Sequence, residues 1–130
     1  MPSPQKTLTI SEYKKMRAKK IKEADVQDEI LKYLALRGVI AFHIPNRGLY
    51  DKRTNRYNRV DKHHVPGVPD LAIILKDGRT VWAECKRPEG GVLSAAQQHL
   101  LGQLTQLGHL AVVVMSVEEL ETFLRTRGLI

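Results

Sequence analysis

The sequence predicts an α/β domain in which helices flank a mixed sheet. Short apolar runs rich in Val, Ile and Leu, typical of buried strands, occupy residues 39–44, 71–75, 80–85 and 110–115. Apolar residues at helical spacing occupy residues 23–37, 94–107 and 117–127. The order of these segments is α-β-β-β-α-β-α, with a crossover strand after the second helix. Such an alternation favours one sheet covered by helices.

The first predicted helix, residues 23–37, carries Val26, Ile30 and Leu34 at intervals of four, and Gly38 follows it as a stop signal. Glu23 lies in its first turn. From the residues alone, this side chain is explained as an acid that interacts favourably with the helix dipole.

The first predicted strand, residues 39–44, is apolar throughout and stops at Pro45. Continuous apolar character predicts that both of its faces are covered. His43 lies within this run, and we interpret it as a histidine of the sheet or core rather than a metal ligand.

The second and third predicted strands form a hairpin whose turn decides which side chains share a face. A two-residue loop would place Asp70 opposite Cys85. A three-residue loop over residues 76–78, with Gly78 left-handed, would place Asp70 opposite Glu84. We favour the three-residue loop.

In that register Asp70 and Glu84 share one face, and the two-residue period of a strand adds Lys86 to it. Two carboxylates with a neighbouring ammonium form an oxygen-donor site suited to Mg²⁺ or Mn²⁺ rather than zinc. The alternative is a surface hairpin with a cross-strand salt bridge, which contributes little stability. Because clustered carboxylates beside a buried sheet are costly without a cation, we favour the metal site.

Positive charge concentrates in two segments of a chain whose net charge is +7. Residues 1–22 carry seven Lys and Arg against one Glu, and residues 45–66 carry six against two Asp. This distribution favours a polyanion partner, with a charged, solvated surface as the alternative. The second segment is a long irregular loop with two interleaved tyrosines, which suits contact with DNA. The side chains that we expect to contact DNA are Asn46, Arg47, Lys52, Arg53, Arg56, Arg59, Lys62, His64 and Arg87.

The domain organisation follows from the same charge pattern. We expect a basic, flexible arm at residues 1–20, with a helix from Ser11 as the ordered alternative, and one domain at residues 21–130. The arm either contacts DNA or serves as a solubilising tail. We find no apolar run of membrane-spanning length, and the lone Cys85 excludes an intramolecular disulfide, which fits a reducing cytoplasm.

The second long helix begins with Ser94-Ala95-Ala96-Gln97, a capping box with Ser at the N-cap and Gln three residues later. Capping is a sufficient structural reason for both residues. The adjacent histidines His63 and His64 lack partners at zinc-finger spacing, so we interpret them as substrate contacts or plain surface residues.

The motifs of the hairpin resemble those of a known nuclease family. Pro69-Asp70 and Glu84-Cys85-Lys86 match the PD-(D/E)xK signature, and the surroundings resemble its VRR-NUC branch, the virus-type replication-repair nucleases. The further matches, which run from about residue 23 to residue 115, are Glu23-x-x-x-Gln27, Pro45-Asn46 with Gly48, Gly67-Val68-Pro69-Asp70-Leu71 and Ser94-x-x-Gln97.

The resemblance implies a restriction-endonuclease-like αβββαβ core that hydrolyses DNA phosphodiester bonds. It implies that Asp70, Glu84 and the Cys85 backbone carbonyl hold Mg²⁺ or Mn²⁺, and that Glu23 completes the site, with Glu29 as the fallback. Lys86 would orient or deprotonate the attacking water or stabilise developing charge, and Gln97 would lie beside the scissile phosphate.

By the same resemblance, short versions of this domain are homodimers related in fold to Holliday-junction resolvases. We therefore expect a structure-selective endonuclease for branched or otherwise structured DNA, of bacteriophage or mobile-element type, acting in the host-cell cytoplasm. The alternatives are a nucleic-acid-binding protein without catalysis and a sequence-specific restriction-type endonuclease.

Overall fold

The computed structural model describes residues 7–45, 50–57 and 63–130. Within them the helices are α1 (Ile10–Lys20), α2 (Glu23–Leu36), α3 (Ala95–Gln106) and α4 (Val117–Thr126). The strands are β1 (Ile40–His43), β2 (Tyr50–Asp51), β3 (Arg56–Tyr57), β4 (Leu71–Ile74), β5 (Thr80–Cys85) and β6 (Leu110–Val114). The α/β class predicted from the sequence is confirmed.

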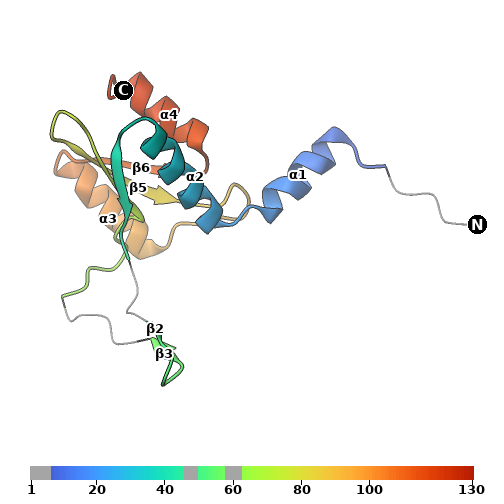
Figure 1. Ribbon diagram of the computed structural model, residues 1–130, viewed down its shortest axis with the longest axis horizontal. Coiled ribbons are helices and arrows are strands. Elements are labelled where there is room, and N and C mark those ends of the chain that lie inside the picture. The colour runs from blue at the N-terminus through green and yellow to red at the C-terminus, as the bar shows by residue number, and fades with distance from the viewer. Residues whose placement is uncertain (1–6, 46–49, 58–62) are drawn as a thin grey trace, which may run out of the picture.

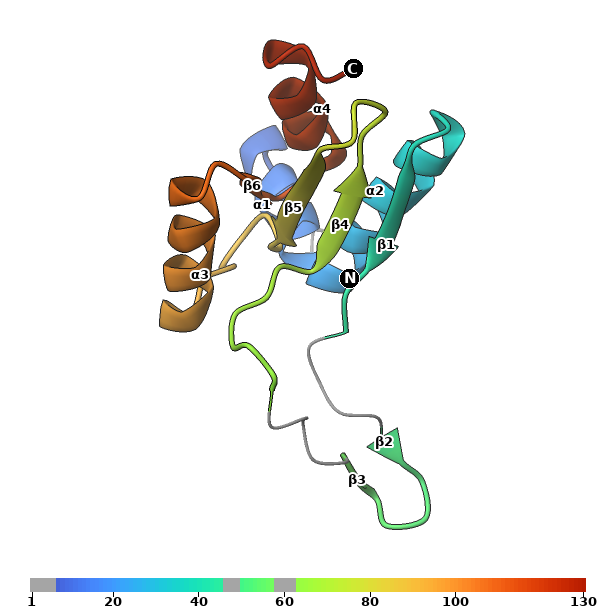
Figure 2. The same ribbon diagram turned by 90° about the vertical axis from the view of Figure 1, so that its left-hand side faces the viewer.

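Four strands form the central sheet in the order β1-β4-β5-β6 (Figure 2). β4 is antiparallel to both β1 and β5, whereas β6 is parallel to β5. A parallel neighbour requires a crossover connection, and α3 supplies it. The sheet is therefore mixed, as the sequence predicted.

Helices cover the sheet unequally. α2 and α4 pack against each other and against one face, whereas α3 packs beside β6 on the opposite face (Figures 1 and 2). The core between the sheet and helices α2 and α4 excludes water almost completely. Its buried side chains include Val26, Ile30, Leu34, Leu71, Ile73, Val81, Ala83, Cys85, Leu120 and Leu124.

The β4–β5 turn has the three-residue form that the sequence predicted. The Leu75 N–H donates to the Arg79 carbonyl at 2.9 Å, and Gly78 has a φ of +92°. Leu71 pairs with Ala83, so continuing the antiparallel register by one residue places Asp70 opposite Glu84. The predicted register is confirmed.

The expectation that both faces of the first strand are covered is wrong. β1 is an edge strand, and 67% of Ile40 and 51% of Phe42 are exposed. These side chains lie on the face opposite α2, and α3 packs beside β6 at the other edge of the sheet. His43 is also exposed.

The segment that was expected to form a flexible arm contains helix α1. Thr9 and Glu12 form a reciprocal cap, in which the Thr9 N–H donates to Glu12 Oε2 at 3.0 Å and the Glu12 N–H donates to Thr9 Oγ1 at 3.1 Å. The side chains of residues 10–16 are all exposed, so no core contact anchors this helix through them. The flexibility of residues 1–20 stays a prediction.

The basic loop contains a small hairpin, in which β2 pairs with β3 and Asn55 adopts a left-handed φ of +54°. Asn tolerates this conformation better than most residues. In the part of the chain that the structure describes, no helix has the length and apolar character needed to cross a membrane.

Candidate metal centre

Three carboxylates meet at one end of the central sheet. Asp70 immediately precedes β4, Glu84 lies in β5, and Glu23 is the first residue of α2. One oxygen from each of the three side chains lies within 4.8 Å of the others. Asp70 and Glu84 are 7% and 0% exposed, and Glu23 is half-buried.

The hydrogen bonds of the two buried carboxylates are incomplete. Asp70 Oδ2 accepts from the Cys85 N–H at 2.9 Å, a bond that joins the start of β4 to the end of β5. Glu84 Oε1 accepts from Gln97 Nε2 at 2.7 Å. Glu84 Oε2 is buried and has no hydrogen-bond partner among the residues that the structure describes. A buried carboxylate oxygen without a partner carries a large desolvation cost, which a cation would offset.

Lys86 provides the positive charge of the cluster. Its Nζ lies 3.5 Å from Glu84 Oε1 and 4.0 Å from Glu23 Oε1. Only 7% of the residue is exposed, so this ammonium is held beside the carboxylates rather than in solvent. One ammonium faces three carboxylates, and the cluster therefore retains negative charge.

Burial raises the pKa of Glu84 and the pKa of Glu23. Burial is the main reason that the pKa of Glu84 rises to about 8, and the neighbouring Asp70 raises it further, while Lys86 opposes the shift. Burial also raises the pKa of Glu23, against the opposing charges of Lys86 and Arg87. Carboxyl groups this close together resist ionisation, and a bound divalent cation makes their ionised form favourable.

The residues present fit a hard divalent cation. All donor atoms are oxygens, three carboxylates converge, and one buried oxygen lacks a partner. Such a set suits Mg²⁺ or Mn²⁺. The Cys85 side chain takes no part, because it lies in the apolar core and burial raises the pKa of its thiol. The metal-binding role assigned to the Cys85 carbonyl stays a prediction.

Gln97 joins the cap of α3 to the cluster. Its Oε1 accepts from the Ser94 N–H at 2.9 Å, and its own N–H donates to Ser94 Oγ at 3.1 Å. With its oxygen occupied, the amide group directs Nε2 towards Glu84. The conformation of Gln97 that caps α3 is therefore also the one that brings its Nε2 to Glu84.

Gly67 allows the chain to pass close to this cap. It has a φ of +82°, and a Cβ on it would lie 2.3 Å from the Ala96 carbonyl oxygen. Only glycine permits this approach. The sequence motif at residues 67–71 drew attention to Gly67 but did not predict its contact with α3.

The predicted DNA-contacting residues are dispersed. Lys52, Arg53, Arg56 and His64 are exposed. Arg87 is exposed beside the cluster, close enough for its charge to oppose the rise in the pKa of Glu23. The remaining predicted contacts, Asn46, Arg47, Arg59 and Lys62, lie outside the described residues. Glu29, the fallback ligand, is exposed and is not part of the cluster.

Two of the cavities in the described part of the chain lie at opposite ends of the sheet. One of about 670 Å³ borders the cluster and is lined by Ile21, Lys22, Glu23, Lys86, Arg87, Gly90, Gly91 and Val92. Sequence reasoning missed Lys22 and Gly91 as lining residues. The Gly90-Gly91 pair could have indicated Gly91, whereas no local pattern indicates Lys22.

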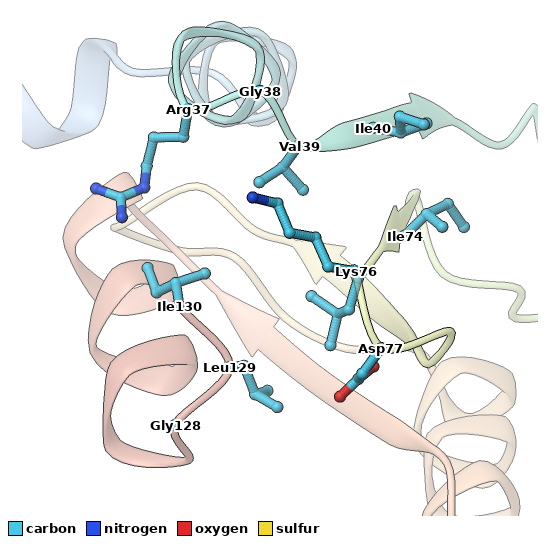
Figure 3. A pocket seen from close by; sticks show the side chains of 11 residues that line it. Arg37, Gly38, Val39, Ile40, Ile74, Lys76, Asp77, Gly128, Leu129 and Ile130 are labelled. Atoms are coloured by element: carbon cyan, nitrogen blue, oxygen red, sulfur yellow. The ribbon is translucent and has the colours of Figure 1, made fainter.

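The other cavity, of about 500 Å³, lies where β4 turns into β5 (Figure 3). Val39, Ile40, Ile74, Leu129 and Ile130 make its lining largely apolar, and Lys76 extends across it towards Val39 (Figure 3). Its acid, Asp77, is paired with Arg79 at 2.6 Å, so this cavity offers no carboxylate cluster.

Comparison with solved structures identifies the architecture. A structure described as "VRR_NUC domain" superimposes with a TM-score of 0.57, covering 79% of this chain and 94% of that one, at 19% sequence identity. The chain has a VRR-NUC-like fold. No protein-family model matches the sequence. No curated protein matches it either. The structural match covers nearly the whole of a VRR_NUC domain, so the fold implied by the sequence motifs is confirmed.

Proposed function

We propose that the protein is a metal-dependent endonuclease that hydrolyses phosphodiester bonds in DNA. The observation that carries the proposal is the buried cluster of Glu23, Asp70 and Glu84 with Lys86 at its side. The VRR-NUC-like fold supports it, because the cluster arises from the motif residues expected of a nuclease of this fold.

In this proposal Asp70, Glu84, Glu23 and the Cys85 carbonyl hold Mg²⁺ or Mn²⁺. When bound, such an ion lowers the pKa of a water molecule and neutralises charge on the phosphate oxygens. Gln97 holds Glu84 Oε1 by a 2.7 Å bond, and the unpartnered Oε2 would be available as a ligand. The Cys85 N–H donates to Asp70 Oδ2 and so holds the Asp70 carboxylate in place.

Hydrolysis forms a bond between a water oxygen and phosphorus and breaks the bond to the leaving oxygen, which takes up a proton. The Lys86 ammonium donates to the attacking water or to the phosphate, and so orients the one or stabilises negative charge on the other. Its position within 4.0 Å of two carboxylates keeps it in place for either role.

We propose that the substrate is branched or otherwise structured DNA, as for a Holliday-junction-resolvase-like enzyme of bacteriophage or mobile-element type. The concentration of positive charge in residues 1–22 and 45–66 supports contact with the DNA backbone. Phosphate contacts position a protein on DNA without reading its sequence, which favours recognition of shape.

We also propose that the protein forms a homodimer. The exposed Ile40 and Phe42 on the edge strand β1 support it, because adjacent exposed apolar side chains often mark an interface. Sedimentation of Phe42→Lys tests this proposal, with Leu107→Lys, at another exposed apolar position, as the matched control. A dimer should dissociate in the first variant alone.

The decisive experiment compares cleavage of linear, supercoiled, flapped and four-way DNA with Mg²⁺, with Mn²⁺ and with a chelator. Asp70→Asn, Glu84→Gln and Lys86→Met should each abolish cleavage, whereas Glu118→Gln, at an exposed acid of α4, should cleave normally. Full cleavage by all three cluster variants would defeat the proposal. Binding that weakens with salt, without metal-dependent cleavage, would indicate the non-catalytic alternative. A fixed fragment pattern on linear DNA would indicate the sequence-specific one.

A further inference from the structure

The cavity beside the carboxylate cluster is shared with it. Glu23 and Lys86 belong to the cluster and also line the cavity, and the other walls come from the start of α2 and the loop after β5. Whatever occupies the cluster therefore continues directly into this space of about 670 Å³. If a polymer binds at the cluster, this cavity is one of the places where its neighbouring monomer can lie.

Two glycines shape the outer wall. A Cβ on Gly91 would lie 2.7 Å from the Arg87 carbonyl oxygen and 3.0 Å from Lys86 Cβ, so the loop can fold back onto β5 only with glycine here. Gly90 has a φ of +76°, and its carbonyl accepts from Arg87 Nη2 at 3.4 Å. The folded loop thus holds the Arg87 guanidinium at the cavity.

The charge of the cavity is positive. Lys22, Lys86 and Arg87 line it against a single acid, Glu23. Among the described residues, neither Lys22 nor Arg87 has a carboxylate within ion-pair distance, whereas Lys86 is engaged by the cluster. Two cations are therefore available to a ligand, and the ligand that this arrangement suits is an anion with oxygen acceptors.

We infer that this cavity binds the phosphate next to the scissile one on the cleaved strand, with Lys22 and Arg87 as its ligands. The inference rests on the proposed nuclease function. A DNA strand carries a negative charge at every phosphate, so a strand with one phosphodiester at the cluster presents the next to these cations. Lys22 and Arg87 are then positioning residues for the strand and leave the chemistry at the cluster unchanged.

The first test compares the double variant Lys22→Gln/Arg87→Gln with Lys32→Gln. Lys32 is an exposed lysine of the same helix α2 and is paired with Asp28. DNA affinity is measured across salt concentrations, alongside KM, kcat and Mn²⁺ affinity. Loss of this one neutralised phosphate should reduce the slope of log K against log salt by roughly 0.7 to 0.9. KM should rise while kcat stays unchanged and Mn²⁺ affinity does not fall, and Lys32→Gln should match the wild type.

The second test locates the phosphate. Substrates carry a single uncharged methylphosphonate at each position flanking the scissile bond. The wild type should lose cleavage efficiency when the phosphate adjacent to the scissile bond is neutralised on one side. The double variant should be insensitive at that position and remain sensitive elsewhere. Equal losses for wild type and double variant at every position would overturn the inference.

The two proposals fail in different ways. If the wild type cleaves no DNA with either metal, the nuclease function fails, and the binding measurement still decides the cavity. An unchanged salt slope in the double variant then overturns the phosphate site. Thermal unfolding of all variants checks that the exposed substitutions leave the fold intact.

Discussion

Glu84→Gln should stabilise the metal-free protein, although it removes a residue of the proposed active centre. Burial and the charge of Asp70 raise the pKa of Glu84 from 4.5 to about 8, so the native state binds a proton more tightly than the unfolded chain. Stability from this group is full below pH 4.5 and falls as the pH rises towards 8. Glutamine is neutral throughout and avoids this loss.

The size of the effect follows from linkage. Between pH 4.5 and pH 7 the unfolded chain gives up the proton while the native state keeps it, at about 1.4 kcal/mol for each pH unit. The gain in the free energy of unfolding at pH 7 is therefore on the order of 3 kcal/mol, or roughly 10 °C in Tm for a chain of this length. At pH 5 it should be below about 1 kcal/mol. The glutamine also fits, because its oxygen can accept from Gln97 and its amide can donate to Asp70.

Urea and thermal unfolding with a chelator at pH 5, 7 and 8 measure this gain. Glu118→Gln, at an exposed acid of α4, is the matched control and should show no comparable change. Saturating Mn²⁺ should raise the stability of the wild type, by about 2.7 kcal/mol at one hundred times Kd, and leave Glu84→Gln almost unchanged. A variant less stable than the wild type at pH 7, or a gain equal at pH 5 and pH 7, would refute the reasoning.

Three further substitutions probe the fold around the site by denaturant unfolding. Gly67→Ala should lower the free energy of unfolding by about 2 kcal/mol more than Gly78→Ala. Both positions have positive φ, but only at Gly67 does the new Cβ meet the Ala96 backbone. Equal losses in the two variants would show that α3 moves away from the new Cβ at little cost. Cys85→Ala should cost about 1–2 kcal/mol, because the side chain is buried in the core. It should retain cleavage, since only the backbone carbonyl of this residue is proposed to bind the ion; loss of cleavage in a folded variant would assign the thiol a role. Leu124→Ala should cost about 2–5 kcal/mol, because the side chain is fully buried between α4 and the sheet; a negligible loss would contradict the tight core.

Some features of the site were decided locally and could be predicted from the sequence. The left-handed Gly78 sets a three-residue turn, and that turn sets the register that brings Asp70 opposite Glu84. Ser94 and Gln97 mark the start of α3 by a cap that spans four residues. Each depends on neighbours in sequence, so the residue types carry the information.

Other features depend on how distant elements pack, and only the tertiary structure decided them. The apolar run of β1 is compatible with a central or an edge strand, and its exposure follows from the sheet order and the position of α3. The choice of Glu23 over Glu29 follows from which part of α2 packs against the sheet, because Glu23 joins the cluster whereas Glu29 is exposed. The positive cavity joins Lys22 to Arg87 across 65 residues of chain, a proximity that no local pattern encodes. Sequence thus determined the carboxylate pair, whereas packing over long separations decided what surrounds it.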